Sequence, residues 1–353
     1  MRLRHLALAV LVASCGPPAT EASNGDVAAE HAATPAAAAA TAAPPRPDGA
    51  PTLVFPLACR IGESCEVQNY VDRDPGPGVK DYRCLSRSYA DHSGVDIRLP
   101  DLVAQQRGVD VLAAAAGTVL RVRDDMADIS VRQTGAAQVD GRDCGNGVVI
   151  GHGDGWETQY CHMARGSIRV RPGEQVAAGA PIGRVGLSGM TEYPHLHITV
   201  RRGGETVDPF APVGGETCDA QAPLWNAAAL QQLAYKRETV LNAGFTSAPV
   251  TMESLEQGAL PAAGAQAPAL VAYVRAINLE PGDVQELTVR GPAGGMVAAT
   301  RAEPMERPRA QHMMFVGRKR PEAGWPPGRY QATYVVTRAD GQEAVRRSFE
   351  IVL

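Results

Sequence analysis

The chain has 353 residues, enough for two domains with cores of their own, and a formal net charge of −4. It contains no strongly basic stretch, so the sequence gives no electrostatic reason to expect nucleic-acid binding.

The N-terminus has the features of an export signal. Residues 1–14 start with two arginines, continue with an apolar run and end in small residues before Cys15. The run is too short to span a bilayer. Val12-Ala13-Ser14-Cys15 resembles the bacterial lipobox, which implies cleavage before Cys15 and lipid attachment to its sulfur. Ordinary signal cleavage beside a chance cysteine is the alternative reading.

A tether is expected next. Residues 15–50 are rich in alanine, proline, threonine and glycine, with too few large apolar groups to pack a core. Such a low-complexity segment would let an anchored domain work at a distance from the lipid.

Six further cysteines in an exported chain suggest three disulfides, and the absence of a CxxC pair argues against a cysteine zinc site. One pairing can be argued from position. Residues 144–161 read as a hairpin whose turn lies at 151–155, which places Cys144 nearly opposite Cys161. We predict that these two form a disulfide, and the other pairings stay open.

Residues 51–215 consist of short apolar runs separated by Gly, Pro and Asp, which predicts an antiparallel β domain. Residues 216–267 are expected to hold a connecting helix and a linker, because Leu224, Leu230, Leu233 and Leu241 recur at helical spacing and Gly244 fits a C-terminal stop. Residues 268–353 alternate again and resemble a small immunoglobulin-like β-sandwich. The fold class is therefore mainly β.

Histidines concentrate in the first β domain. Of the eight in the chain, His5 and His31 precede it and His312 follows it. His152 is expected at the hairpin turn, as an ordinary solvated residue. The remaining histidines lie in three short motifs, each weak on its own: His92-x3-Asp96, Tyr160-Cys161-His162 and His195-Leu196-His197.

Taken together and in this order, the three motifs resemble the M23 family of zinc metallopeptidases, the lysostaphin-like and LytM-like peptidoglycan endopeptidases. The text between them agrees as well, from "DVLAAAAGTVLRV" through "GNGVVIGHGDGWETQYCHM" to "VRPGEQVAAGAPIGRVGLSG", and "DPF" at 208–210 closes the domain. The resemblance covers about residues 90–212. It implies that His92, Asp96 and His197 bind Zn²⁺ and that His162 and His195 form the catalytic pair.

The chemistry fits that division. Three protein ligands leave a fourth zinc position for water, and zinc brings the pKa of that water to about 7. The two other imidazoles can deprotonate the water, stabilise the oxyanion and return a proton to the leaving amine, although which imidazole does which stays open. The HExxH motif of thermolysin-like enzymes is absent.

The expected function is hydrolysis of the peptide cross-links of bacterial peptidoglycan. Two alternatives are a non-catalytic LytM-like regulator of other wall hydrolases and a secreted zinc protease that acts on proteins. The lipobox and family together imply a cell-envelope protein, lipid-anchored to the outer membrane and facing the periplasm of a Gram-negative bacterium. The expected partners are peptidoglycan peptide stems and the membrane, and the sequence names no protein partner for the C-terminal domain.

Overall fold

The computed structural model describes residues 45–215 and 218–353. The expected signal peptide, Cys15 and most of the tether lie outside this part of the chain. Within it, nearly all regular structure is antiparallel β-strand, as the sequence predicts. None of the helices in the described part has the length and apolar character needed to cross a bilayer.

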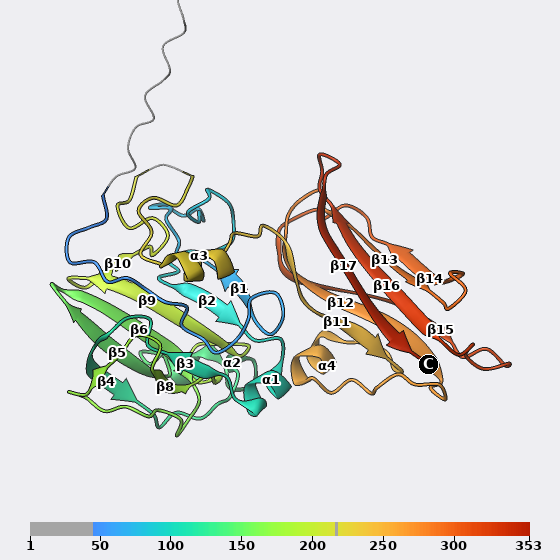
Figure 1. The fold of residues 1–353 in the computed structure, drawn as a ribbon, viewed down its shortest axis with the longest axis horizontal. Helices are drawn as coiled ribbons and strands as arrows, with labels where there is room; N and C mark the ends of the chain where they lie inside the picture. Colours follow the sequence, from blue (N-terminus) through green and yellow to red (C-terminus); the bar gives the residue numbers. More distant parts are fainter. Residues whose placement is uncertain (1–44, 216–217) are drawn as a thin grey trace, which may run out of the picture. The chain divides into compact units, whose positions relative to one another are not determined.

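One large antiparallel sheet organises the first domain. Its strands follow the order β1-β2-β9-β6-β5-β4-β7, and β10 pairs with β9 (Figure 1). Their bounds are Glu66–Asn69 (β1), Val95–Arg98 (β2), Gly117–Arg123 (β4), Asn146–Gly153 (β5), Trp156–Met163 (β6), Gln175–Val176 (β7), His195–Arg202 (β9) and Glu205–Val207 (β10).

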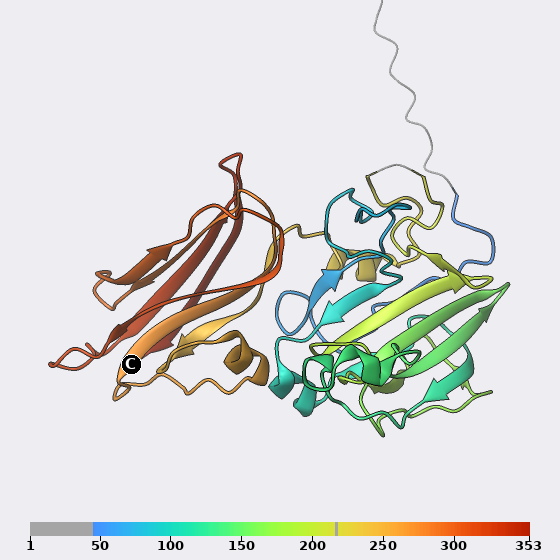
Figure 2. The same ribbon diagram turned by 180° about the vertical axis from the view of Figure 1, so that it is seen from behind.

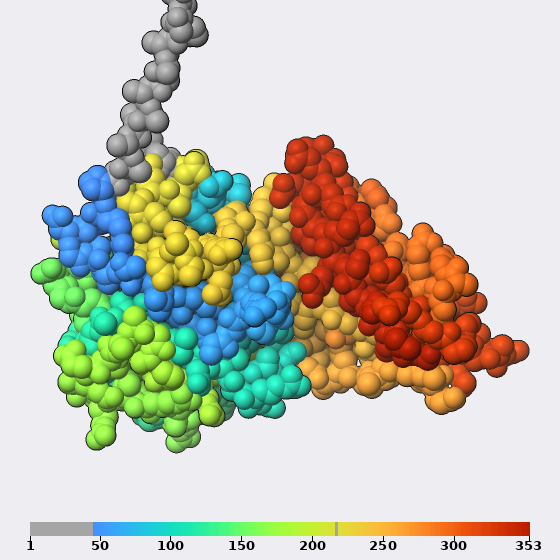
Figure 3. Space-filling view, in the orientation of Figure 1, coloured from blue at the N-terminus to red at the C-terminus, as the bar shows by residue number. Residues whose placement is uncertain are grey.

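One face of this sheet is covered and forms the core. The small sheet of β3 (Asp110–Leu112) and β8 (Pro181–Arg184) packs there, together with helix α3 (Ala227–Gln232). Residues 45–65, blue in Figure 3, lie across the surface between the residues around α3 and the green strands. This segment is fixed by the bridges Leu53 to Trp225 and Leu57 to Val111.

The other face is open at its centre, where β9, β6 and β5 are seen uncovered from behind (Figure 2). Alternation along β9 explains the difference between the faces. Leu196, Ile198 and Val200 are at most 1% exposed and point into the core. The residues that alternate with them along the strand therefore point to the open face, and they are His195, His197, Thr199 and Arg201.

Three disulfides brace the first domain. Cys144 is joined to Cys161 at the base of the β5–β6 hairpin, the pair expected from the sequence. Cys59 is joined to Cys65, and Cys84 to Cys218. The last bond ties the loop before β2 to the segment that leaves the domain, which the hairpin argument could not foresee.

Short helices cap loops around the first domain. α1 (Leu102–Arg107) begins at Asp101, whose side chain accepts from the amide of Ala104. α2 (Val131–Thr134) and the 3₁₀ turn Ala136–Val139 lie in the insert between β4 and β5, and Arg132 of α2 forms an ion pair with Glu192. The segment between β4 and β5 is therefore partly helical.

The C-terminal region is a two-sheet sandwich. Its three-stranded sheet has the order β11-β12-β15 and its four-stranded sheet the order β14-β13-β16-β17. The strands are Thr239–Thr246 (β11), Ala269–Leu279 (β12), Val284–Arg290 (β13), Met296–Arg301 (β14), Arg309–Lys319 (β15), Arg329–Thr337 (β16) and Glu343–Val352 (β17).

The prediction of a connecting helix that extends to Leu241 is wrong beyond the first turns of that helix. α3 ends at Gln232, and residues 239–246 form β11, which pairs along β12. Leu241 is thus a strand residue, and the sandwich begins well before residue 268. Tertiary pairing outweighs the helical spacing here, because β11 completes a sheet that buries Ala272 and Val274. Residues 250–267 carry a second short helix, α4 (Met252–Gln257).

Candidate active site

Three side chains from two neighbouring strands converge on the open face. Asp96 on β2 lies directly opposite His197 on β9, and the nitrogen Nδ1 of His197 is 2.9 Å from Asp96 Oδ1. His92, in the loop before β2, places Nε2 3.2 Å from His197 Nδ1 and 3.2 Å from Asp96 Oδ2. Their candidate ligand atoms all lie within 4.8 Å of one another.

Each of these side chains is held through its other polar atom. His92 Nδ1 donates to the carbonyl of Tyr70, at 2.6 Å, which leaves Nε2 as an acceptor. Asn69 donates to Asp96 Oδ2, at 2.9 Å. His197 Nε2 is 2.9 Å from the hydroxyl of Thr199. Such outer contacts are the kind that orient metal ligands.

The donor set suits a zinc ion. Two imidazole nitrogens and one carboxylate oxygen are ligands that Zn²⁺ takes, and three protein ligands are the usual number for a catalytic site. The arrangement also fits a cation on physical grounds. The acceptor lone pair of His92 faces the Asp96 carboxylate and His197, and a positive charge between them would relieve that repulsion.

Two further histidines form a pair beside this cluster. The rings of His162 and His195 have centroids 4.5 Å apart, and His162 is 6.0 Å from the ring of His197. His162 Nδ1 donates to the carbonyl of Ser188, at 2.8 Å, and His195 Nδ1 to the carbonyl of Tyr193, at 3.0 Å. Both rings therefore carry the Nε2 lone pair on the side away from these carbonyls, and His195 Nε2 lies 3.5 Å from Asp96 Oδ1.

Local backbone geometry places His162. It adopts a φ of +59°, which turns the chain at the end of β6. Its amide donates to the carbonyl of Cys144, so the disulfide and the hairpin hold the residue in this conformation. The position of His162 is thus set by its own backbone conformation and by the hairpin.

Burial and charge set the protonation of the site. Burial would raise the pKa of Asp96, but His92 and His195 outweigh it and hold that pKa well below its usual range. Burial lowers the pKa of His162 well below its usual value, and the neighbouring His195 and His197 add to this. Asp96 is therefore an anion and His162 a neutral base at neutral pH.

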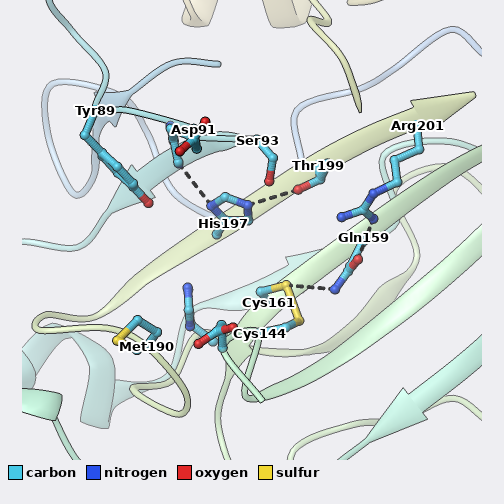
Figure 4. A pocket seen from close by; sticks show the side chains of 13 residues that line it. Tyr89, Asp91, Ser93, Cys144, Gln159, Cys161, Met190, His197, Thr199 and Arg201 are labelled. Carbon is cyan, nitrogen blue, oxygen red and sulfur yellow. Dashed lines mark hydrogen bonds between the residues drawn. A yellow bond between two sulfur atoms is a disulfide. The ribbon is translucent and has the colours of Figure 1, made fainter. Parts of the chain in front are cut away.

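The cluster opens into a cavity of about 410 Å³, which we call the metal-side cavity. Figure 4 shows His197 and Thr199 along one wall, with Arg201 and Gln159 at the far end and the Cys144–Cys161 disulfide below. Tyr89 and Met190 lie at its rim.

His152 and His312, which belong to none of the three motifs, lie outside the cluster of site residues. His152 lies within β5 rather than at the turn, and it contacts the carbonyl of Ala116 and the hydroxyl of Thr158. The expectation of a solvated turn residue is therefore wrong, although the residue has a structural role. His312 contacts Gln285 in the sandwich.

Sequence reasoning missed the supporting residues. Thr199 could have been found, because it lies two residues beyond His197 on the same strand face. Asn69 and the carbonyl of Tyr70 could not, because they come from β1 and the residue after it, which only the fold brings beside β2.

Comparison with known proteins gives the family of the first domain. Residues 90–209 match Peptidase family M23. Cell division protein DipM of Caulobacter vibrioides is 28% identical over 122 residues, which are 35% of this chain and 16% of DipM. Peptidoglycan DD-endopeptidase ShyA of Vibrio cholerae is 28% identical over 124 residues, 35% of this chain and 23% of ShyA. The chain thus matches less than two thirds of either relative's length.

Comparison with solved structures also gives a partial match. It is the catalytic domain of a mutant of the prophage-encoded M23 protein EnpA from Enterococcus faecalis, with 25% identity and a TM-score of 0.31. The match covers 45% of this chain and 98% of that one.

Proposed function

Starting from an M23 peptidase domain at residues 90–209, we propose that this chain is a zinc-dependent endopeptidase that cuts the peptide cross-links of bacterial peptidoglycan. The observation that carries the proposal is the convergence of His92, Asp96 and His197 beside the ring pair of His162 and His195, on the open face of the sheet.

In this proposal His92, Asp96 and His197 hold the metal. When bound, Zn²⁺ supplies a Lewis acid that polarises the scissile carbonyl and makes a water molecule acidic near neutral pH. Asn69, Thr199 and the carbonyl of Tyr70 keep the three ligands oriented.

His162 and His195 handle the protons. Each has Nδ1 bonded to a backbone carbonyl and so offers Nε2 toward the substrate. A neutral imidazole there can accept the proton of the attacking water on Nε2 and later give it to the leaving amine, while the second, when it is protonated on both nitrogens, can donate Nε2–H to the developing oxyanion. Their contact at 4.5 Å between centroids lets both reach one peptide bond.

The substrate class rests on the relatives. ShyA is named a peptidoglycan DD-endopeptidase, and the matched region carries the site described above. We extend that class of substrate, cross-linked stem peptides, to this chain. The envelope location is likewise proposed, from the lipobox at Cys15. A Cys15→Ser variant that still sedimented with membranes would contradict the anchor.

The test is digestion of purified cell-wall sacculi by the chain from residue 51 onward. We expect release of cross-link cleavage products that a chelator abolishes and added Zn²⁺ restores, and an Asp96→Ala variant should release none. A folded, zinc-loaded protein that leaves sacculi intact but cleaves unfolded proteins would favour a protease that acts on proteins instead. A folded chain that retains no zinc would favour the regulatory alternative.

A further inference from the structure

A second hollow adjoins the metal-side cavity on the side of His195. We call it the His195 hollow; its volume is about 510 Å³, and Tyr89 and Met190 border both spaces. Its walls come from β1, β2, the insert with α2 and the loop before β9. One wall comes from elsewhere in the chain, and it consists of Ala310 and Gln311 on β15 of the C-terminal sandwich.

We propose that β15 of the sandwich forms part of the substrate groove and that Gln311 binds the main chain of the peptide there. The inference deepens the proposed function and rests on it: the ligand is an extended peptide stem, and the group that Gln311 recognises is an amide N–H.

Hydrogen bonds between β1 and the sandwich hold this wall in place. The side chain of Gln68 donates to the carbonyl of Ala310, at 3.0 Å, and the side chain of Asn278 donates to the carbonyl of Gln68, at 3.1 Å. Gln68 is 1% exposed and Asn278 is also buried. Hydrogen bonds between such buried groups fix the position of β15 relative to β1. Gln311 therefore has a defined position beside the hollow.

A cluster of charged side chains also joins the first domain to the C-terminal sandwich. Glu256 on α4 accepts from Arg98 on β2, at 2.7 Å, and from Arg275 on β12, at 2.6 Å. The guanidinium of Arg98 lies 3.7 Å from the ring centroid of Tyr193. The carbonyl of Tyr193 in turn accepts from His195 Nδ1. The wall is thus connected to the loop that carries one of the two catalytic-pair histidines.

The side chain of Gln311 has an unpaired hydrogen-bond acceptor. Its Oε1 is buried and has no hydrogen-bond partner among the residues that the structure describes. A buried carbonyl oxygen without a partner is costly, and such atoms deserve an explanation. The Gln311 side chain lines the His195 hollow, so a turn of its amide group would bring Oε1 to a peptide there. An extended chain presents an amide N–H at alternate positions along each edge and would supply the missing partner.

The test measures binding and turnover of a soluble cross-linked muropeptide dimer. Gln311→Met removes the acceptor at nearly constant volume, and Gln331→Met on β16 of the other sheet is the matched control. Binding is measured by calorimetry in a His162→Ala background, and turnover with His162 intact. Gln311→Met should weaken binding and raise KM by about three- to tenfold, with kcat and zinc content unchanged. The melting temperature should not fall, because no bond within the described chain is lost.

The outcomes separate the two proposals. If the chain cuts the dimer and Gln311→Met binds it as tightly as the control, the inference about Gln311 is overturned while the enzyme stands. If binding weakens only together with a fall in melting temperature, Gln311 is structural and the inference is again overturned. If the parent protein neither binds nor cuts the dimer, the proposed function fails and this inference fails with it.

Discussion

At the level of single residues, three histidines of the site are each held by a hydrogen bond from the ring nitrogen that points away from the groove. His92, His162 and His195 each donate Nδ1–H to a backbone carbonyl, and this fixes the tautomer that carries its lone pair on Nε2. Backbone carbonyls are rigid partners, so ring orientation is set by the fold rather than by other side chains. Asp96 and His197 are the exceptions, since the side chains of Asn69 and Thr199 hold them.

A buried carboxyl at the end of the first domain gives a prediction about pH. Burial raises the pKa of Asp208 from 3.8 to about 6, although its bond to the amide of Phe210 and the charge of Arg73 work against this. A carboxyl whose pKa is raised on folding contributes stability at acid pH, and this contribution is lost as the pH rises through about 6.

Asp208→Asn keeps an acceptor for Phe210 but does not titrate. The melting temperature of the variant minus that of the wild type should therefore rise between about pH 4 and pH 7, by an amount equivalent to about 2 kcal/mol. Thermal unfolding followed by circular dichroism at several pH values gives this difference. A difference that stays constant over the range would show that Asp208 is ionised in the folded protein throughout.

At the scale of elements, the pairing of β2 with β9 builds the metal cluster, and it depends on Gly94. The pairing places Asp96 opposite His197. A Cβ at Gly94 would lie 2.6 Å from His197 Nε2 and 2.7 Å from the carbonyl oxygen of Ile198. Both distances are shorter than contact allows, so the glycine is required for the imidazole to fit under this loop.

Gly94→Ala should displace the His197 ring and weaken zinc affinity by about 10- to 100-fold, the scale seen when support of a metal ligand is lost. It should also cost about 1–3 kcal/mol of stability through overpacking. Competition with a chromogenic chelator measures the affinity. Gly264→Ala is the control, because a Cβ there meets nothing within 4 Å. Equal zinc affinity in the two variants would contradict the described placement of His197.

Some strands could be predicted from the sequence pattern and others could not. Period-two alternation was sufficient for β9, whose apolar residues share one buried face, and the glycine-rich turn was sufficient for the β5–β6 hairpin. It was insufficient for β11, whose leucine and alanine spacing favours a helix while its pairing with β12 makes it a strand. Asn69, Gln311 and Glu256 could not be assigned from sequence, because their roles arise from contacts between segments far apart in the chain.

At the scale of the whole described molecule, Glu256 joins the peptidase domain to the sandwich. Arg98 and Arg275 are both at most 1% exposed, and Glu256 neutralises them from α4. Burial lowers the pKa of Arg98 to about 10, and the charge of Glu256 works against that fall. Without the carboxylate, two buried guanidinium groups would face each other.

Glu256→Ala should therefore destabilise the protein by about 2–4 kcal/mol. The exposed Glu253 on the same helix provides the control, and Glu253→Ala should change stability by less than about 0.5 kcal/mol. Chemical denaturation measures both. Similar stabilities for the two variants would mean that the junction contributes little to the folded state.

The two histidines of β9 are assigned different roles, His197 as a zinc ligand and His195 in proton transfer, and the zinc content of variants distinguishes these roles. Purified His195→Ala and His197→Ala proteins, both checked for folding, are compared by mass-spectrometric metal analysis. We expect one zinc per chain in the His195 variant, with turnover lower by about 10²- to 10⁴-fold, and no retained zinc in the His197 variant. Zinc retained by the His197 variant and lost from the His195 variant would contradict the assignment.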